Sequence, residues 1–239
     1  MLKNYTPRVS GNNTGQTVYN RHPTNMRQYL ILAFISTLSI ASFGQRQSLY
    51  KAGGYSTLAN FQNNTPNYLD TFIMSRRTTG DIKAWGGNDY MIKSMKETTT
   101  KKVIKNKIWG IFINDTLYLN GINLTGLDWY SKVELFGKYC FLKPAFPVSP
   151  KIQKELGVID SQYGYTFGAI GGAIQGAKIA VKRIPLIYSI LNGQKMLLSK
   201  KNIIMLLESH PEIKTNFLNE PKQESEETLL KYLKILNEK

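Results

Sequence analysis

Strand-forming residues dominate one stretch near the middle of the chain, Ile108-Trp-Gly-Ile-Phe-Ile113, Asn114-Asp115 and Thr116-Leu-Tyr-Leu-Asn120. Branched and aromatic side chains of this kind favour extended backbone, and a short polar connection is typical of a tight turn. We therefore predict two antiparallel strands joined by Asn114-Asp115. This hairpin makes an antiparallel sheet the expected framework of the protein.

A second hairpin is predicted directly downstream. Its strands are Trp129-Tyr-Ser-Lys-Val-Glu-Leu135 and Tyr139-Cys-Phe-Leu-Lys143, and its turn is Phe136-Gly-Lys138. Alternation along the first strand predicts a sheet with one solvated face. The residues assigned to one side of that strand are Tyr130, Lys132 and Glu134.

A third hairpin is predicted from Arg183-Ile-Pro-Leu-Ile-Tyr-Ser-Ile-Leu191 and Gln194-Lys-Met-Leu-Leu198, with Asn192-Gly193 between them. An Asn-Gly pair favours a type I′ turn because both of its residues tolerate positive φ. Pro185 places the beginning of the first strand at a sheet edge. We expect this hairpin to extend the same sheet.

The region before the first hairpin mixes both kinds of element. Residues 56–64 indicate a short helix with Ser56 as its N-cap, and residues 67–77 indicate a strand. Residues 82–85 and 90–93 are interpreted as a hairpin around the turn Gly86-Gly-Asn-Asp89. Trp85 and Asp89 flank that turn. They either line a binding surface, or form a local structure in which Trp85 packs over the turn and Asp89 bonds its own backbone.

Residues 96–107 carry the densest basic cluster in the chain, and its candidate binding residues are Lys101, Lys102 and Lys105. One interpretation is a lysine face that contacts only water. The other is a surface for an anionic partner, such as phospholipid or lipopolysaccharide head groups. Nucleic acid is not predicted as a partner, because no recognisable binding motif accompanies the charge.

Overall composition sets broad limits. The 239 residues carry a formal net charge of +15, and 42% of them are hydrophobic, as expected for a chain that buries a core. The single cysteine, Cys140, cannot form an intramolecular disulfide. No metal site and no cofactor are predicted.

Catalytic residues are not evident either. His210 has no paired nucleophile, and it precedes Pro211 at a predicted helix junction, where a local cap is the simpler role. Acidic residues are scattered without a spacing that pairs two carboxylates for acid–base catalysis. We therefore predict that the protein is not an enzyme.

The N-terminal region predicts export. Met26-Arg27-Gln28 precedes a short apolar run from Tyr29 to Ala41, and Ser42-Phe-Gly44 then supplies small residues before a cut. This is the pattern of a signal peptide over residues 26–44 with cleavage after Gly44. Residues 1–25 are interpreted as a disordered extension or a mis-assigned start. The mature protein, residues 45–239, is then expected to be a single domain in the periplasm, at the outer membrane or outside the cell.

Glycines recur at every fourth position in Thr166-Phe-Gly-Ala-Ile-Gly-Gly-Ala-Ile-Gln-Gly-Ala-Lys-Ile-Ala-Val181, at Gly168, Gly172 and Gly176. On a helix they would form a smooth groove. Each interior glycine costs about 1 kcal/mol relative to alanine, so close packing must offset the loss. The groove is expected to hold the sheet of the same domain, a second copy of the chain or a membrane partner.

Three helices are predicted at the C-terminus. Ser199 is the expected N-cap of the first, over residues 200–208, and residues 212–218 form the second. Residues 226–237 form an amphipathic helix with glutamates in its first turn and lysines later, which agrees with the helix dipole.

Several of these segments together resemble a bacterial family of exported proteins with a domain of unknown function. They are Gly-Gly-Asn-Asp-Tyr at 86–90, Trp-Gly-Ile-Phe-Ile-Asn-Asp-Thr-Leu-Tyr at 109–118, the glycine-spaced segment at 167–177 and the closing Leu-Leu-Lys-Tyr-Leu-Lys-Ile-Leu-Asn-Glu-Lys. The resemblance covers about residues 48–239. It implies export and a single domain, and it assigns no functional residues.

The sequence thus predicts an α+β fold: an antiparallel sheet, a glycine-rich helix packed on it and C-terminal helices. The predicted function is a non-enzymatic binding or structural protein. Its partner is expected to be an anionic envelope surface or a second copy of the chain. The alternative is a membrane-associated assembly component that uses the Gly168/Gly172/Gly176 groove.

Overall fold

The computed structural model describes residues 50–96, 99–158 and 173–239. These residues belong to one compact unit that spans residues 48–239. The predicted signal peptide, the extension before it, Gly168 and Gly172 lie outside the described residues.

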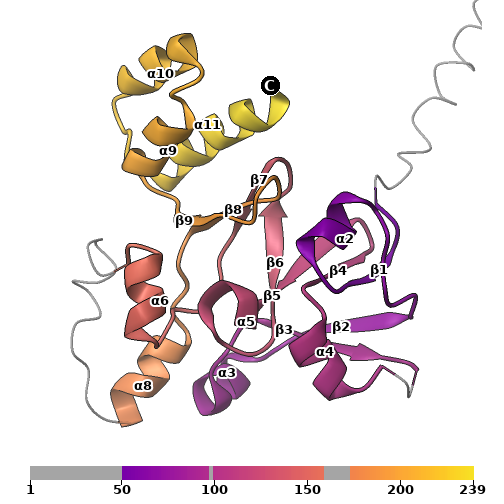
Figure 1. Cartoon of the computed structure of the whole chain (residues 1–239). Coiled ribbons are helices and arrows are strands. Elements are labelled where there is room, and N and C mark those ends of the chain that lie inside the picture. Colours follow the sequence, from indigo (N-terminus) through magenta and orange to yellow (C-terminus); the bar gives the residue numbers. More distant parts are fainter. Residues whose placement is uncertain (1–49, 97–98, 159–172) are drawn as a thin grey trace, which may run out of the picture. The chain divides into compact units, whose positions relative to one another are not determined.

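The described residues form a nine-stranded sheet in which every pairing is antiparallel (Figure 1). The strands are β1 (Gly53–Tyr55), β2 (Phe72–Arg76), β3 (Tyr90–Ser94), β4 (Gly110–Ile113), β5 (Thr116–Asn120), β6 (Tyr130–Leu135), β7 (Tyr139–Leu142), β8 (Leu186–Ser189) and β9 (Lys195–Leu197). Their main order is β1-β4-β5-β6-β7-β8-β9, while β3 pairs with both β2 and β6. The predicted α+β fold with an antiparallel sheet is confirmed.

Helices occupy the connections between strands and the C-terminus. They are α2 (Leu58–Gln62), α3 (Thr79–Trp85), α4 (Lys101–Lys107), α5 (Gly121–Thr125), α6 (Pro150–Glu155), α8 (Ala173–Ala180), α9 (Lys200–Leu206), α10 (Pro211–Leu218) and α11 (Glu226–Glu238). Ser199 caps α9 as predicted, since its side chain accepts a hydrogen bond from the Asn202 backbone. The cap of α2 is Thr57, and not the predicted Ser56.

The predicted strand over residues 82–85 is wrong, because these residues belong to α3. A capping box at Thr78 and Asp81 explains the helix. Thr78 Oγ1 accepts from the Asp81 backbone N–H at 3.1 Å, and the Asp81 carboxylate accepts from the Thr78 backbone N–H at 3.2 Å. These two bonds satisfy backbone donors that a short helix otherwise leaves unpaired. As a result, β3 pairs with β2 and not with residues 82–85.

Turn chemistry differs between the first and third hairpins. Asn114 and Asp115 both have positive φ, 48° and 55°, so they form the tight turn expected between β4 and β5. The β8–β9 hairpin is confirmed, but its predicted type I′ turn is wrong. Residues 190–194 connect these strands, and Gly193, with φ of 77°, is the one residue of that connection in the left-handed region.

Tyr130, Lys132 and Glu134, which the sequence assigned to one side of β6, differ in burial. The Tyr130 side chain is fully buried, and its hydroxyl donates to the carbonyl of Ile104 at 2.6 Å. Lys132 and Glu134, in contrast, are exposed. The start of β6 is therefore covered by α4, whereas its later part has a solvated side.

Three groups of buried side chains form the core. The first includes Tyr55, Phe61, Trp109 and Leu186, and joins the middle of the sheet to α2. The second includes Phe141, Ile187, Phe217 and Leu233, and packs α9, α10 and α11 against β7 to β9 (Figure 1). The third includes Phe72, Ile92, Ile104 and Tyr130, and packs α4 against β2, β3 and β6.

The described part of the glycine-rich segment is α8, which contains Gly176. Its main neighbour is another helix, α3. Ile179 of α8 packs against the first core group, so the helix is attached to the body of the domain.

Candidate functional site

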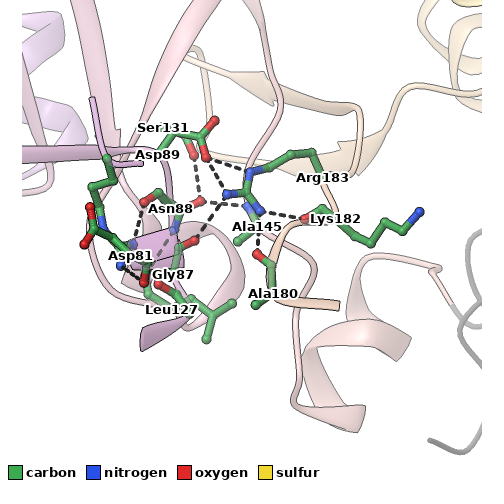
Figure 2. Close-up of polar contacts among 12 residues, drawn as sticks. Asp81, Gly87, Asn88, Asp89, Leu127, Ser131, Ala145, Ala180, Lys182 and Arg183 are labelled. Atoms are coloured by element: carbon green, nitrogen blue, oxygen red, sulfur yellow. Dashed lines mark hydrogen bonds and ion pairs between the residues drawn. The ribbon is translucent and has the colours of Figure 1, made fainter. Parts of the chain in front are cut away.

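The turn Gly86-Gly-Asn-Asp89 lies at the centre of a buried polar network (Figure 2). Asn88 has no exposed surface, and its Oδ1 accepts from Ser131 Oγ at 2.8 Å and from the Ala145 backbone N–H at 2.7 Å. Its Nδ2 donates to the Asp128 carbonyl at 3.1 Å. Buried amides of this kind need such partners. Asn88 therefore joins three segments of the chain, and its side-chain amide is used in hydrogen bonds within the protein.

Backbone conformation explains the two glycines before Asn88. Gly86 and Gly87 have φ of 62° and 84°, a region that side chains disfavour. A Cβ added to Gly87 would lie 2.8 Å from the Asp128 carbonyl. Arg77 holds the same turn, since its Nη1 donates to the carbonyls of Gly86 at 2.6 Å and Asn88 at 2.9 Å.

Asp89 is bound by Arg183 (Figure 2). Arg183 Nε donates to Asp89 Oδ1 at 2.9 Å, and its Nη1 donates to the carbonyls of Ala180 at 2.9 Å and Lys182 at 2.8 Å. Arg183 thus connects the turn to the end of α8. The interpretation that Asp89 bonds its own backbone is wrong. Trp85 is 82% exposed and does not pack over the turn.

Trp129 is the aromatic residue around which the basic side chains gather. Lys105 Nζ, Lys101 Nζ and the Arg77 guanidinium lie 4.8, 5.3 and 5.8 Å from the centre of its ring. Cations at this distance are attracted to an aromatic face. Trp129 also has φ of 72°, an unusual conformation for a bulky residue. Its carbonyl accepts from the Gly121 backbone N–H at 2.7 Å, which helps to hold that conformation.

A cavity of about 340 Å³ lies between β3 and α4, beside Trp129. Its apolar lining includes Ile92 and Ile104, which are 1% and 2% exposed. Basic and hydroxyl-bearing residues complete the lining: Lys93, Lys96, Lys101, Ser94, Thr99 and Thr100. We call this site the β3–α4 cavity. It combines an apolar floor with a basic rim.

Asp70 supplies a negative charge next to this rim. Burial disfavours its ionised form, but hydrogen bonds from Ser94 and Thr99 outweigh that effect and hold the pKa of Asp70 below its usual value. Asp70 therefore offsets one cation, and Lys96 is the lysine that interacts with it. Within the described part of the chain, Lys101 has no carboxylate partner. The rim keeps an excess of positive charge.

The structure brings together some of the sequence-predicted site residues and separates others. Lys101 and Lys105 both lie by Trp129, whereas Lys102 is exposed on the same helix and does not line the cavity. Trp85 and Asp89 do not line the cavity either. Trp129 was not predicted as a site residue, since the sequence assigned it to a strand, and its positive φ is invisible in the sequence.

Cys140 and His210 are the remaining residues of types that often act in catalysis. Cys140 is fully buried, and burial raises the pKa of its thiol to about 12. His210 stands at the N-cap position of α10 but makes no side-chain capping bond. Among residues 50–96, 99–158 and 173–239, no group of three or more His, Cys, Asp or Glu side chains could hold a metal ion. Within the same residues, no helix has the length and apolar character needed to span a bilayer.

Fold and site together define a class: an α+β protein with one antiparallel sheet and a basic-rimmed cavity beside it. Residues 53–239 match the family of unknown function DUF6563, and the chain belongs to this family. The predicted membership of a domain-of-unknown-function family is therefore confirmed. No curated protein and no solved structure matches the chain.

Proposed function

We propose that this protein is an exported, non-enzymatic binding protein whose β3–α4 cavity takes an anionic ligand with an apolar portion. The observation that carries the proposal is the meeting of Lys101 with Ile92, Ile104 and Trp129 around a single cavity of about 340 Å³. Lysines alone would be consistent with a solvated surface. An apolar floor beneath them favours a ligand that is charged at one end.

The size of the cavity limits the ligand. Small-molecule pockets usually have volumes of about 300–1,000 Å³, so this cavity is at the lower limit. It would accept an aromatic group or part of an acyl chain, and the anionic head group would remain at the rim. The Ser94 and Thr100 hydroxyls are used within the protein, by Asp70 and by the cap of α4, so the lysine ammonium at the rim is the group offered to the head group.

Charge supports the same choice of ligand. The chain has a formal net charge of +15, which favours the approach of anions over a long range. The predicted signal peptide would place the mature protein among anionic lipids and lipopolysaccharide of the cell envelope. Head groups of these molecules have the required charge next to an apolar chain.

Binding of dodecyl phosphate below its micellar concentration tests the proposal. Dodecylphosphocholine, whose head group has no net charge, is the comparison ligand, and isothermal titration calorimetry with the full chain is the measurement. We expect dodecyl phosphate to bind at least about tenfold more tightly, which corresponds to about 1.4 kcal/mol. Equal affinity for the two ligands would contradict an anion-selective site.

Two neighbouring lysines offer a matched pair of variants. Lys101→Glu reverses a charge at the cavity rim, and Lys102→Glu reverses a charge on the same helix outside it. We expect Lys101→Glu to weaken dodecyl phosphate binding about tenfold and Lys102→Glu to weaken it less than about twofold, since solvent screens the more distant charge. Equal effects of the two variants would mean that the whole helix, and not the cavity, attracts the anion.

A further inference from the structure

Among the residues that the structure describes, β2 pairs with β3 alone, and its outer edge has backbone groups without a partner. β2 pairs with β3 from Phe72↔Ser94 to Arg76↔Tyr90, without a bulge. Hydrogen bonds that continue this ladder run from the Met95 N–H to the Thr71 carbonyl at 3.1 Å and from the Arg77 N–H to the Asp89 carbonyl at 2.7 Å. Hydrogen-bonded positions alternate along an antiparallel pair. The backbone N–H and C=O groups of the odd-numbered residues of β2 therefore point toward β3.

It follows that the N–H and C=O groups of Phe72, Met74 and Arg76 point away from β3. Within the residues that the structure describes, they have no hydrogen-bond partner. Natural proteins usually protect such an edge with proline, lysine or a bulge, and β2 contains none of these. Apolar side chains are also exposed here: Ile73 is 51% exposed and Leu69, just before the strand, is 68% exposed.

We propose that the β2 edge is a dimerisation surface, where β2 of one copy pairs antiparallel with β2 of a second copy. The outward-facing residues are symmetric about Met74. A two-fold axis at Met74 places Phe72 opposite Arg76 of the second copy and Met74 opposite itself. All three residues of each copy then form both of their backbone hydrogen bonds.

Side chains are compatible with this register. Arg76 lies opposite Phe72 of the second copy and not opposite another cation, so the pairing brings no like charges directly together. On the exposed face, Ile73 lies opposite Ser75 of the second copy. β2 has no acidic side chain, and its one charged residue is Arg76. The strand is thus complementary to itself.

The dependence of binding on salt concentration distinguishes pairing with a second copy from binding of an acidic peptide at the β2 edge. Two chains that each carry a formal net charge of +15 repel each other, and salt screens this repulsion. The dimer therefore tightens as ionic strength rises. An acidic peptide on the same edge would bind more weakly under those conditions.

Disulfide cross-linking tests the register with the full-length chain. Ile73→Cys and Ser75→Cys are prepared separately, mixed and oxidised. Residues directly opposite in a non-bonded pair have Cα atoms about 4.5 Å apart, within disulfide range. The mixture is expected to form a covalent dimer, whereas in each variant alone the two cysteines are two residues out of register and form no cross-link. Cys140 is fully buried and does not compete.

No cross-linking in the mixture would overturn the proposal, and so would equal cross-linking of each variant alone. A backbone variant gives an independent measurement. Arg76→Pro removes an outward N–H that β3 does not use, so an edge strand can tolerate it, and Arg76→Ala keeps that N–H. Sedimentation equilibrium should show a dimer for the unmodified chain and Arg76→Ala, and at least a tenfold weaker dimer for Arg76→Pro.

A monomer at all protein and salt concentrations would also refute the proposal. The unmodified β3–α4 cavity would still bind dodecyl phosphate in that case. The two proposals therefore fail separately, because the backbone edge of β2 is not part of the cavity lining.

Discussion

The side-chain amide of Asn88 forms hydrogen bonds with several distant segments of the chain. Its side-chain amide contacts residues from β6, from the loop before β6 and from the segment after β7. A single amide therefore fixes the relative positions of strands that are distant in sequence. Its importance comes from burial, because a buried polar group that loses its partner cannot turn to water.

Replacing Asn88 by alanine should destabilise the protein strongly. The change leaves the Ser131 hydroxyl and the Ala145 N–H without their partner, at about 1–3 kcal/mol for each buried group, while the Asp128 carbonyl keeps the backbone N–H of residue 88. We expect a loss on the order of 3–5 kcal/mol in the free energy of unfolding, measured with urea. The exposed Asn106→Ala on α4 is the control and should change stability by less than about 0.5 kcal/mol. Similar losses in both variants would refute the structural role of the network.

Cys140 should make stability depend on alkaline pH. Burial raises the pKa of its thiol to about 12 in the folded protein, while an unfolded cysteine ionises near about 8.5. Between these values the unfolded state binds fewer protons, so stability falls as pH rises, by up to about 1.4 kcal/mol per pH unit. Urea unfolding between pH 8 and 10.5 should show a steeper loss for the unmodified protein than for Cys140→Ala. If stability falls equally with pH in both proteins, the Cys140 thiol does not have a raised pKa in the folded state.

At the scale of elements, α11 is attached to the sheet by the side-chain amide of Asn237, which forms two hydrogen bonds with the backbone of Tyr139 in β7. The Tyr139 N–H donates to Asn237 Oδ1 at 2.8 Å, and Asn237 Nδ2 donates to the Tyr139 carbonyl at 3.0 Å. Gly137 lies beneath this amide. A Cβ added to Gly137 would be 2.3 Å from Asn237 Cγ, which is closer than atoms can approach.

Gly137→Ala should therefore displace the end of α11 and destabilise the protein by about 2–4 kcal/mol. Asn237→Ala removes the two hydrogen bonds and should cost about 1–2 kcal/mol. Because the alanine at 237 lacks the atoms that clash, the double variant should lose less stability than the sum of the two single variants. Thermal and urea unfolding of all four proteins measure this coupling. Strict additivity would contradict the contact.

Elements also show where local sequence signals are sufficient. The β4–β5, β6–β7 and β8–β9 hairpins were predicted because both strands of each lie close in sequence and carry β-forming residues. β1 was missed, since its Gly-Gly-Tyr sequence contains little strand signal and its pairing with β4 is distant. Residues 82–85 were misassigned because the capping box at Thr78 and Asp81 outweighed their strand propensity.

At the scale of the whole molecule, the positive charge and the predicted export belong together in one proposal. A cationic protein outside the cytoplasm would meet anionic envelope surfaces, and the β3–α4 cavity is the place where we propose that their components bind. The β2 edge adds a second contact of a different chemical kind.

Export is tested by the mature N-terminus. We expect mass spectrometry of the protein purified from its cells to find a chain that begins at Gln45, because the predicted signal peptide over residues 26–44 would be removed after Gly44. The expected fraction is periplasmic or extracellular. An intact Met1 on cytosolic protein would contradict both the cleavage and the proposed compartment.

Local patterns were enough to establish the fold class, the three hairpins, the C-terminal helices and the basic character of α4, because each depends on residues close together in the chain. The β3–α4 cavity, the burial of Asn88 and the open edge of β2 required the folded structure. Trp129 meets Lys101 and Lys105 although β4, β5 and α5 separate them in the sequence, and within the described residues β2 pairs with β3 alone. Long-range pairing places these groups, and no local propensity records which distant segments will meet.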